Sequence, residues 1–361
     1  MKIDPNNEKL YYTGRIDYTN PQEPVWVFPC TSVAFRFTGN VLKIKVRNKK
    51  AYWEGRLGYI LDGEQSFFVL PDDGELEVEI PVRQKTVNET GANIPKINDA
   101  DSDIHEFMLY KRQDACHEVT ILGFEIGDGE KLLAPRERLD RRIEVYGDSV
   151  SAGEVSEALH CVGQGDPKHN GEYSNSWYSY PWILARKLGA ELHDNAQGGL
   201  ALMDNTGWFN MPKLIGLESI WDKICYNPTF QKTTFWDFKR YTPDICIVAV
   251  GQNDQNPENY MTFDYDGEKA VFWRERYKAF LMGLREKYPH AYIICCTTLL
   301  YHDDTWDRAI GQVVQECEDD KISQYLFNRN GKGTPGHLRI PEAEEMAEEL
   351  YTYINTLGVW G

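Results

Sequence analysis

Residues 143–153 read IEVYGDSVSAG. The strand-like run 143–146 leads directly into Gly147-Asp148-Ser149, and Gly153 completes the pattern Gly-Asp-Ser-x-x-x-Gly. An apolar run that ends in a polar, glycine-marked turn is typical of a strand that passes into a loop or helix. The stretch therefore predicts a serine at a strand-to-helix turn, which is a suitable place for a nucleophile. We expect the Asp148 carboxylate to cap backbone donors at this turn.

Three further loops have the same form. Gly251-Gln252-Asn253-Asp254 follows the apolar run 245–250, which reads as a buried strand. Asn195-Ala196-Gln197-Gly198-Gly199 also follows an apolar stretch, and a glycine there lets a backbone N–H approach a ligand closely. His337 ends the loop 333–337, just before a helix that opens at Pro341. Because ligands bind outside the carboxyl ends of the strands of an open α/β sheet, we expect the four loops to share one crevice.

This order of serine, glycine, asparagine and histidine resembles the SGNH hydrolase superfamily, also called GDSL esterases, over roughly residues 136–361. The resemblance implies a three-layer α/β/α hydrolase domain. Ser149 would be the nucleophile and His337 the base that takes its proton. The backbone N–H of Ser149, that of Gly198 or its neighbour Gly199, and the side-chain amide of Asn253 would form the oxyanion hole.

The chain departs from the superfamily pattern at one position. The usual last block places an aspartate three residues before the histidine, where it holds the imidazole in the right tautomer. Here that position is Thr334. We therefore interpret the site as a Ser149–His337 dyad, oriented by a backbone carbonyl near Thr334 or Pro335. A remote Asp or Glu that reaches the ring is the open alternative.

The first part of the chain has a different pattern. Apolar residues alternate with charged ones, as in Leu42, Ile44 and Val46, and turn signals such as Asp62-Gly63 separate the runs. Short antiparallel strands of this kind favour an all-β sandwich, which we interpret as a jelly roll. We expect the sandwich over residues 1–132, a linker rich in proline and charge over 133–141, and the hydrolase domain over 142–361.

A jelly roll that opens with Gly14-Arg15-Ile16-Asp17 ahead of an SGNH domain is similar to the two-domain enzymes of carbohydrate esterase family 2. That resemblance implies a serine esterase that removes O-acetyl groups from acetylated hemicellulose oligosaccharides of xylan or mannan. Two other hypotheses are an SGNH esterase or thioesterase for other short acyl esters and a non-catalytic glycan-binding protein, because a fold does not fix a function.

Two residues on a loop that follows the predicted strand 291–300 are candidates for substrate binding. Trp306 is the expected platform for a sugar ring, and the alternative is that its ring is buried at the start of the next helix. His302, the rival catalytic base, lies on the same loop. The remaining histidines match no metal-ligand spacing, so neither a metal nor a cofactor is implied.

Composition limits the partners of the protein. The 361 residues carry a formal net charge of −17, which opposes binding to nucleic acid or to an anionic membrane and leaves neutral glycans acceptable. The polar start of the chain and the lack of a long apolar run indicate a cytoplasmic enzyme with reduced cysteines. The exposed strand edges of a sandwich favour homo-oligomerisation as a hypothesis. The residues leave open which sugar and which hydroxyl carry the acetyl group.

Overall fold

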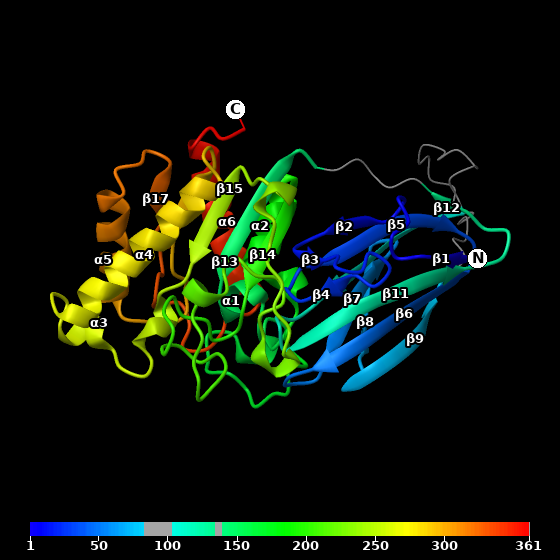
Figure 1. Ribbon diagram of the computed structural model, residues 1–361, viewed down its shortest axis with the longest axis horizontal. Coiled ribbons are helices and arrows are strands. Elements are labelled where there is room, and N and C mark those ends of the chain that lie inside the picture. Colours follow the sequence, from blue (N-terminus) through cyan, green and yellow to red (C-terminus); the bar gives the residue numbers. More distant parts are fainter. Residues whose placement is uncertain (83–102, 134–138, 361) are drawn as a thin grey trace.

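The computed structural model describes residues 1–82, 103–133 and 139–360. Two six-stranded antiparallel sheets form the first part of the chain, and a five-stranded parallel sheet with helices forms the rest. Figure 1 shows the two antiparallel sheets at one end of the molecule and the parallel sheet with its helices at the other. The predicted α/β class with a separate β-rich part is therefore confirmed.

The two antiparallel sheets face each other across one hydrophobic core. The first contains β1 (Lys2–Ile3), β3 (Ile16–Asp17), β4 (Val25–Trp26), β6 (Val41–Lys50), β9 (Asp73–Pro81) and β11 (His117–Ile126), in the order β3-β4-β11-β6-β9 with β1 also on β11. The second contains β2 (Tyr11–Thr13), β5 (Ser32–Thr38), β7 (Arg56–Leu61), β8 (Glu64–Val69), β10 (Ile104–Lys111) and β12 (Leu132–Leu133), in the order β12-β5-β10-β7-β8 with β2 also on β5.

Strand β6 shows why this part of the sequence folds as a sandwich. Leu42, Ile44 and Val46 are fully buried, whereas the lysines between them are at least partly exposed. On the neighbouring strand β9, Ile80 lies opposite Leu42 and Leu76 lies opposite Val46. The period of two in the sequence thus places one apolar face of each strand on the core, as the alternation predicted.

The parallel sheet follows in the order β14-β13-β15-β16-β17. Its strands are β13 (Arg141–Gly147), β14 (Ala190–Ala196), β15 (Ile245–Ala249), β16 (Tyr292–Cys295) and β17 (Ile322–Gln324). The α-helices are α1 (Ser149–Ala152), α2 (Tyr180–Leu188), α3 (Tyr260–Phe263), α4 (Glu268–Lys287), α5 (Asp304–Glu316) and α6 (Ile340–Thr356). Short 3-10 helices are η2 (Leu159–Cys161), η3 (Ser176–Tyr178), η4 (Leu217–Ser219), η5 (Pro228–Phe230), η6 (Phe238–Arg240) and η7 (Gln252–Gln255).

Helices cover both faces of the parallel sheet. Alternate residues of β15 belong to different cores: Cys246 and Val248 pack with residues of α4 and α5, and Ile245 and Ile247 pack with residues of α2 and α6. A strand that is buried on both faces reads as a continuous apolar run, which is how the stretch 245–250 appeared in the sequence. The result is three layers, as the resemblance implied, with the carboxyl ends of the strands at one edge.

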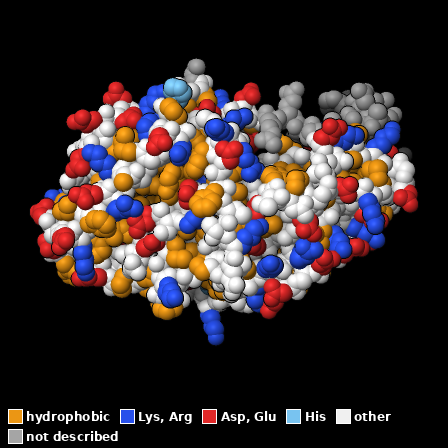
Figure 2. All heavy atoms as spheres, in the orientation of Figure 1, with side chains coloured by type: hydrophobic (Ala, Val, Ile, Leu, Met, Phe, Trp, Pro, Cys, Tyr) orange, Lys and Arg blue, Asp and Glu red, His pale blue; other side chains and the backbone are white. Residues whose placement is uncertain are grey.

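The predicted domain boundaries stay a prediction, and residues 134–138 of the expected linker lie outside the described residues. The jelly-roll connectivity of the two antiparallel sheets also stays a prediction. Side chains of both charges are interspersed over the face that Figure 2 shows. Within the described ranges, none of the helices combines the length and the apolar character that a membrane span requires. All eight cysteines lie as free thiols.

Candidate active site

Ser149 stands at the turn between β13 and α1, where the sequence placed it. Strand β13 ends at Gly147, and Ser149 is the first residue of α1. The carboxylate of Asp148 accepts the backbone N–H of Val150 at 2.9 Å, which confirms its predicted role as a helix cap. A Cβ on Gly147 would lie only 2.1 Å from Oγ of Ser151, so the turn requires glycine there.

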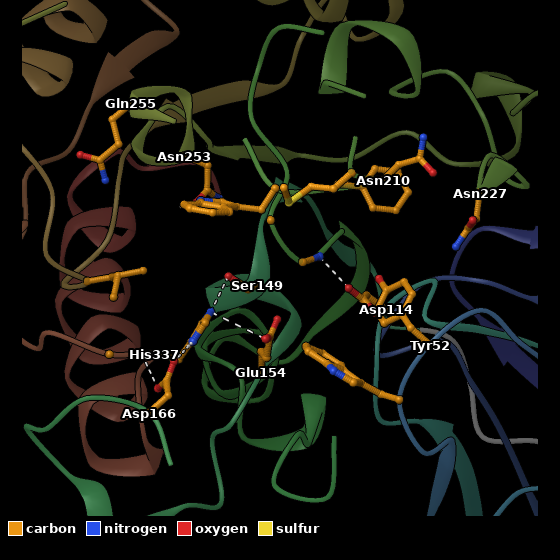
Figure 3. A pocket seen from close by; sticks show the side chains of 18 of the residues that line it. Tyr52, Asp114, Ser149, Glu154, Asp166, Asn210, Asn227, Asn253, Gln255 and His337 are labelled. Atoms are coloured by element: carbon orange, nitrogen blue, oxygen red, sulfur yellow. Dashed lines mark hydrogen bonds and ion pairs between the residues drawn. The ribbon is translucent and has the colours of Figure 1, made fainter. Parts of the chain in front are cut away.

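Ser149, His337 and Asp166 form a hydrogen-bonded chain (Figure 3). Nε2 of His337 lies 2.8 Å from Oγ of Ser149, and its Nδ1 lies 2.6 Å from Oδ2 of Asp166. The other carboxylate oxygen of Asp166 accepts the backbone N–H of His337 at 2.9 Å and Nη2 of Arg339 at 3.0 Å. Serine, imidazole and carboxylate thus lie in the order that a catalytic triad requires.

The predicted dyad, oriented by a backbone carbonyl near Thr334 or Pro335, is therefore wrong. The partner of the imidazole is a carboxylate from the segment between η2 and η3, which folds back beside the loop that carries His337. Thr334 has a structural role, since its backbone N–H donates to Leu299 and its carbonyl accepts the N–H of Tyr301. The open alternative of a remote carboxylate is the arrangement that the structure shows.

The charges around the imidazole favour its protonated form. Burial by itself would lower the pKa of His337, but the charge of Glu154 and the hydrogen bond to Asp166 raise it to about 9. Oε1 of Glu154 lies 3.9 Å from Nε2 of His337. Burial, together with the nearby charge of Asp114, raises the pKa of Glu154 itself to about 7. Although partial burial opposes it, the hydrogen bond from His337 holds the pKa of Asp166 well below its usual range.

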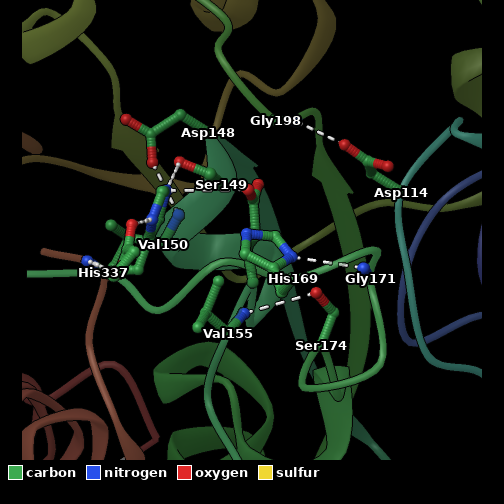
Figure 4. Close-up of polar contacts among 12 residues, drawn as sticks. Asp114, Asp148, Ser149, Val150, Val155, His169, Gly171, Ser174, Gly198 and His337 are labelled. Atoms are coloured by element: carbon green, nitrogen blue, oxygen red, sulfur yellow. Dashed lines mark hydrogen bonds and ion pairs between the residues drawn. The ribbon is translucent and has the colours of Figure 1, made fainter. Parts of the chain in front are cut away.

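The predicted oxyanion-hole residues lie around the same serine. The loop after β14 brings in Gly198 and Gly199, and η7 after β15 brings in Asn253. The backbone N–H of Gly198 donates to Oδ2 of Asp114 at 2.6 Å (Figure 4). Nδ2 of Asn253 donates to Oδ2 of Asp148 and to the carbonyl of Leu200, both at 3.0 Å. Asp148 therefore holds both the helix that carries the nucleophile and the amide of Asn253.

These groups open into a cavity of about 680 Å³. The sandwich contributes part of the wall through Trp53 and through Tyr52 and Asp114, which Figure 3 labels. The parallel-sheet part contributes the reactive groups and the apolar residues Trp208, Phe209, Met211, Leu300 and Tyr301. Among the described residues of the lining there are three carboxylates and neither Lys nor Arg. The cavity has the size and the mixed apolar and polar wall of a small-molecule site.

Comparison with known proteins supports the sequence resemblance. The profile described as "Carbohydrate esterase 2 N-terminal" matches residues 12–135. The cellulase/esterase CelE of Acetivibrio thermocellus is 28% identical over 367 aligned positions, which cover 98% of this chain and 40% of that protein. An acetylxylan esterase / glucomannan deacetylase of Cellvibrio japonicus is 25% identical over 262 positions, which cover 71% of this chain and 68% of that protein.

A solved structure agrees along nearly the whole chain. A family two carbohydrate esterase from Clostridium thermocellum, in complex with cellohexaose, has a TM-score of 0.76 and 25% identity, with 97% of this chain and 99% of that chain covered. The chain is therefore similar to carbohydrate esterase family 2 along nearly its whole length, and residues 12–135 match the N-terminal model of that family. The chain spans less than half the length of CelE. An activity like that of CelE is therefore a proposal for this chain.

The two residues predicted to bind substrate lie outside the cavity. Trp306 is fully buried in the core between α4 and α5, and its Nε1 donates to Asn259. His302 is also buried, with Nδ1 2.6 Å from the carbonyl of Leu300 and Nε2 3.2 Å from Asp307. The prediction that they bind substrate is wrong, because helix α5 begins at Asp304 and turns Trp306 into the core. Leu300 and Tyr301, of which Tyr301 is 71% exposed, are the residues of this segment that line the cavity.

Sequence reasoning missed most of the cavity wall, including four residues that matter for the reactive groups. Asp166, Glu154, Asp114 and Trp53 line the cavity, and none of them lies in the Ser, Gly, Asn and His blocks. Glu154 lies five residues after Ser149 and immediately after Gly153. This closeness to the nucleophile in the sequence could have indicated that Glu154 belongs to the site. The other three come from loops whose path no local pattern predicts.

Proposed function

We propose that the protein is a serine esterase that removes O-acetyl groups from acetylated xylan or mannan oligosaccharides. The hydrogen-bonded chain from Ser149 through His337 to Asp166 is the observation that carries this proposal. The name of the Cellvibrio relative, acetylxylan esterase / glucomannan deacetylase, supports the acetyl ester as the bond and hemicellulose as the substrate class, and the name of CelE supports an esterase. An acidic cavity without Lys or Arg in its described lining agrees with a neutral glycan.

The geometry supports a two-step reaction. Nε2 of neutral His337 takes the proton of Ser149 as Oγ attacks the acetyl carbonyl carbon, and Asp166 stabilises the imidazolium that forms. The protonated imidazole then gives this proton to the sugar oxygen as the ester bond breaks, which leaves an acetyl group on Ser149. In the second step His337 removes a proton from water as the water oxygen attacks the acetyl carbonyl carbon. The imidazolium then returns this proton to Oγ of Ser149 as the bond from Oγ to the acetyl group breaks, which releases the acetyl group as acetic acid and restores Ser149 and neutral His337.

The carbonyl oxygen becomes negatively charged in each step and needs donors. We assign this role to the backbone N–H groups of Ser149 and Gly199, and to the side chain of Asn253 once its Nδ2 exchanges the carbonyl of Leu200 for the oxyanion. Gly199 is preferred over Gly198, because the N–H of Gly198 is already donated to Asp114. Each such donor is typically worth about 3 to 4 kcal/mol in the transition state.

Three further predictions belong to the same proposal. The orders β4-β11-β6-β9 and β5-β10-β7-β8 within the two antiparallel sheets support a jelly roll, because an eight-stranded jelly roll distributes its strands in this way. A cytoplasmic location and a homo-oligomeric state stay proposals. Cell fractionation would test the first, and light scattering of the purified protein would test the second.

Acetate release is the direct test of the esterase. The intact protein and Ser149→Ala are compared on acetylated xylan and mannan oligosaccharides, with Ser66→Ala, an exposed serine of β8, as the matched control. We expect release by the intact protein and by the control, and none by Ser149→Ala. Hydrolysis of aryl or thioesters alone would favour the other acyl esterases. Glycan binding without hydrolysis of any ester would favour the non-catalytic hypothesis.

A further inference from the structure

The segment that carries Asp166 has little support of its own. Between η2, which ends at Cys161, and η3, which begins at Ser176, the chain forms neither helix nor strand. Residues 162–166 are all exposed to solvent. A segment with few buried apolar contacts has low local stability, so contacts at its ends must fix the position of the carboxylate.

One end is held by Arg339 and by Glu342, whose Oε1 accepts the backbone N–H of Gly163 at 3.0 Å. This arginine is fully buried, and its Nη2 donates to Oδ1 of Asp166 at 3.0 Å. The side chain of Asp166 is 28% exposed, and ion pairs that water reaches contribute little stability. A second anchor is therefore needed on the other side of Asp166.

The sandwich supplies that anchor through backbone carbonyls of the segment 170–174. Four of these five carbonyls accept hydrogen bonds from it: Asn170 from Glu54 N at 2.9 Å, Gly171 from Gln113 Nε2 at 3.5 Å, Glu172 from Arg56 Nη1 at 3.1 Å, and Ser174 from Arg112 Nε at 3.1 Å. Tyr173, the fifth, accepts the N–H of Glu157. Backbone groups removed from water require partners, so this part of the chain depends on the sandwich for its path.

Ring packing extends the contact toward Asp166. Trp53 of the sandwich packs against His169, with ring centroids 5.1 Å apart. A Cβ at Gly171 would lie 2.7 Å from Nε2 of Gln113 and 3.1 Å from Cβ of Trp53, so the two surfaces fit closely. Figure 4 shows Gly171 and His169 together below the reactive serine. His169 is three residues from Asp166, which is at most about 11 Å of extended chain.

We propose that the sandwich positions the catalytic aspartate: Trp53, Glu54, Arg56, Arg112 and Gln113, here called the sandwich clamp, hold the segment 169–174 so that Asp166 meets His337. The proposal rests on the proposed function only in taking Ser149, His337 and Asp166 as the reactive groups. Its consequence is that the sandwich contributes to catalysis by positioning a carboxylate that belongs to another part of the chain.

The test disturbs the contact between the sandwich clamp and the segment 169–174 by a substitution in that segment. Gly171→Ala places a methyl group against Gln113 and Trp53, whereas Gly163→Ala, the matched control, meets no atom within 4 Å. Both glycines have a left-handed backbone, with φ of 89° and 68°, so both variants carry similar backbone strain. Arg56→Met, which removes the bond to the carbonyl of Glu172 and the ion pair with Glu54 without adding bulk, is the second variant if Gly171→Ala does not fold.

Two measurements distinguish a displaced Asp166 from a general loss of structure. Imidazole titration by NMR follows His337 directly and needs no substrate, so it decides the proposal even if the intact protein hydrolyses no acetyl ester. We expect Gly171→Ala to shift the titration of His337 toward that of Asp166→Asn, and Gly163→Ala to leave it in place. Where the enzyme is active, we expect kcat to fall at least tenfold in Gly171→Ala and by less than twofold in Gly163→Ala.

A double variant tests whether the clamp acts through Asp166. In an Asp166→Asn background, Gly171→Ala is expected to lower kcat by less than twofold, because the carboxylate of Asp166, which Gly171→Ala would misplace, is already absent. An equal loss in both backgrounds would overturn the proposal. An unchanged His337 titration in folded Gly171→Ala or Arg56→Met would overturn it as well.

Discussion

Nδ1 of His337 lies 2.6 Å from Oδ2 of Asp166, although 171 residues separate them in the chain. The carboxylate fixes the tautomer in which Nε2 can accept the proton of Ser149. We expect Asp166→Asn to lower kcat by roughly 10²- to 10⁴-fold, because an amide can present its N–H to Nδ1 and favour the wrong tautomer. Kinetics on an aryl acetate would measure this, with exposed Asp140→Asn as the control. A loss of less than tenfold would mean that another group orients the ring.

The sequence was sufficient to predict the site residues that lie just after the parallel strands. Ser149, Gly199 and Asn253 each lie just beyond the end of a strand of the parallel sheet, and the carboxyl ends of parallel strands meet at one edge whatever path the loops take. Asp166 could not be found in this way. Its position depends on Arg339 and on backbone carbonyls that bond to the sandwich, and neither contact leaves a local pattern in the sequence.

Trp306 shows how one local pattern supports two interpretations. A tryptophan after a strand end can face a ligand or begin the buried face of the next helix. Ile310 and Val313 follow at the spacing of one helical face, and all three are fully buried in the structure. The helical periodicity of α5 was therefore the stronger signal, and the loop position was the weaker one.

Glu154 is expected to set the pH dependence of the reaction. His337 must be neutral to accept a proton, so kcat/KM should rise with pH until the imidazole, with its pKa of about 9, has lost its proton. Glu154→Gln removes the negative charge 3.9 Å from Nε2, and Asp114, Asp148 and Asp166 remain nearby. The pKa of His337 should fall, and the acid limb of the profile should move to lower pH by roughly one unit.

The pH profile of kcat/KM from pH 5 to 10 measures this shift. Asp140→Asn, which removes an exposed carboxylate elsewhere, should leave the limb in place. We also expect Glu154→Gln to reach the same plateau at high pH as the intact protein. An unchanged acid limb, or a limb that moves to higher pH, would show that the charge of Glu154 does not act on His337.

Trp208 replaces Trp306 as the residue expected to bind the sugar ring. It lines the cavity and is 54% exposed, so its ring is available for stacking. Trp208→Ala should raise KM for acetylated oligosaccharides about five- to tenfold and leave kcat/KM for a small aryl acetate within twofold, since only the larger substrate reaches the ring. Phe263→Ala, 81% exposed and outside the cavity lining, is the control. An equal fall in kcat/KM on both substrates would mean that Trp208 maintains the shape of the site and does not bind the sugar ring.

Arg15 and Glu144 make the ion pair that joins the sandwich to the strand of the nucleophile. Both side chains are fully buried, and Nη2 of Arg15 lies 2.9 Å from Oε1 of Glu144 on β13. The guanidinium also donates to the carbonyl of Trp221 at 2.7 Å, and Asn195 donates to the same Oε1 at 3.0 Å. Arg15→Met would leave a buried carboxylate without its cation.

Such a loss typically costs about 3 to 5 kcal/mol, so Arg15→Met should lower the free energy of unfolding by that amount. Arg47→Met provides the contrast, because Arg47 pairs with Glu75 at 35% and 44% side-chain exposure, and an exposed pair is worth at most about 1 kcal/mol. Urea unfolding of the two variants measures the difference. Adding Glu144→Leu to Arg15→Met should recover part of the loss, because it removes the unpaired charge. No recovery would mean that the guanidinium acts mainly through the carbonyl of Trp221 and the packing of its own stem.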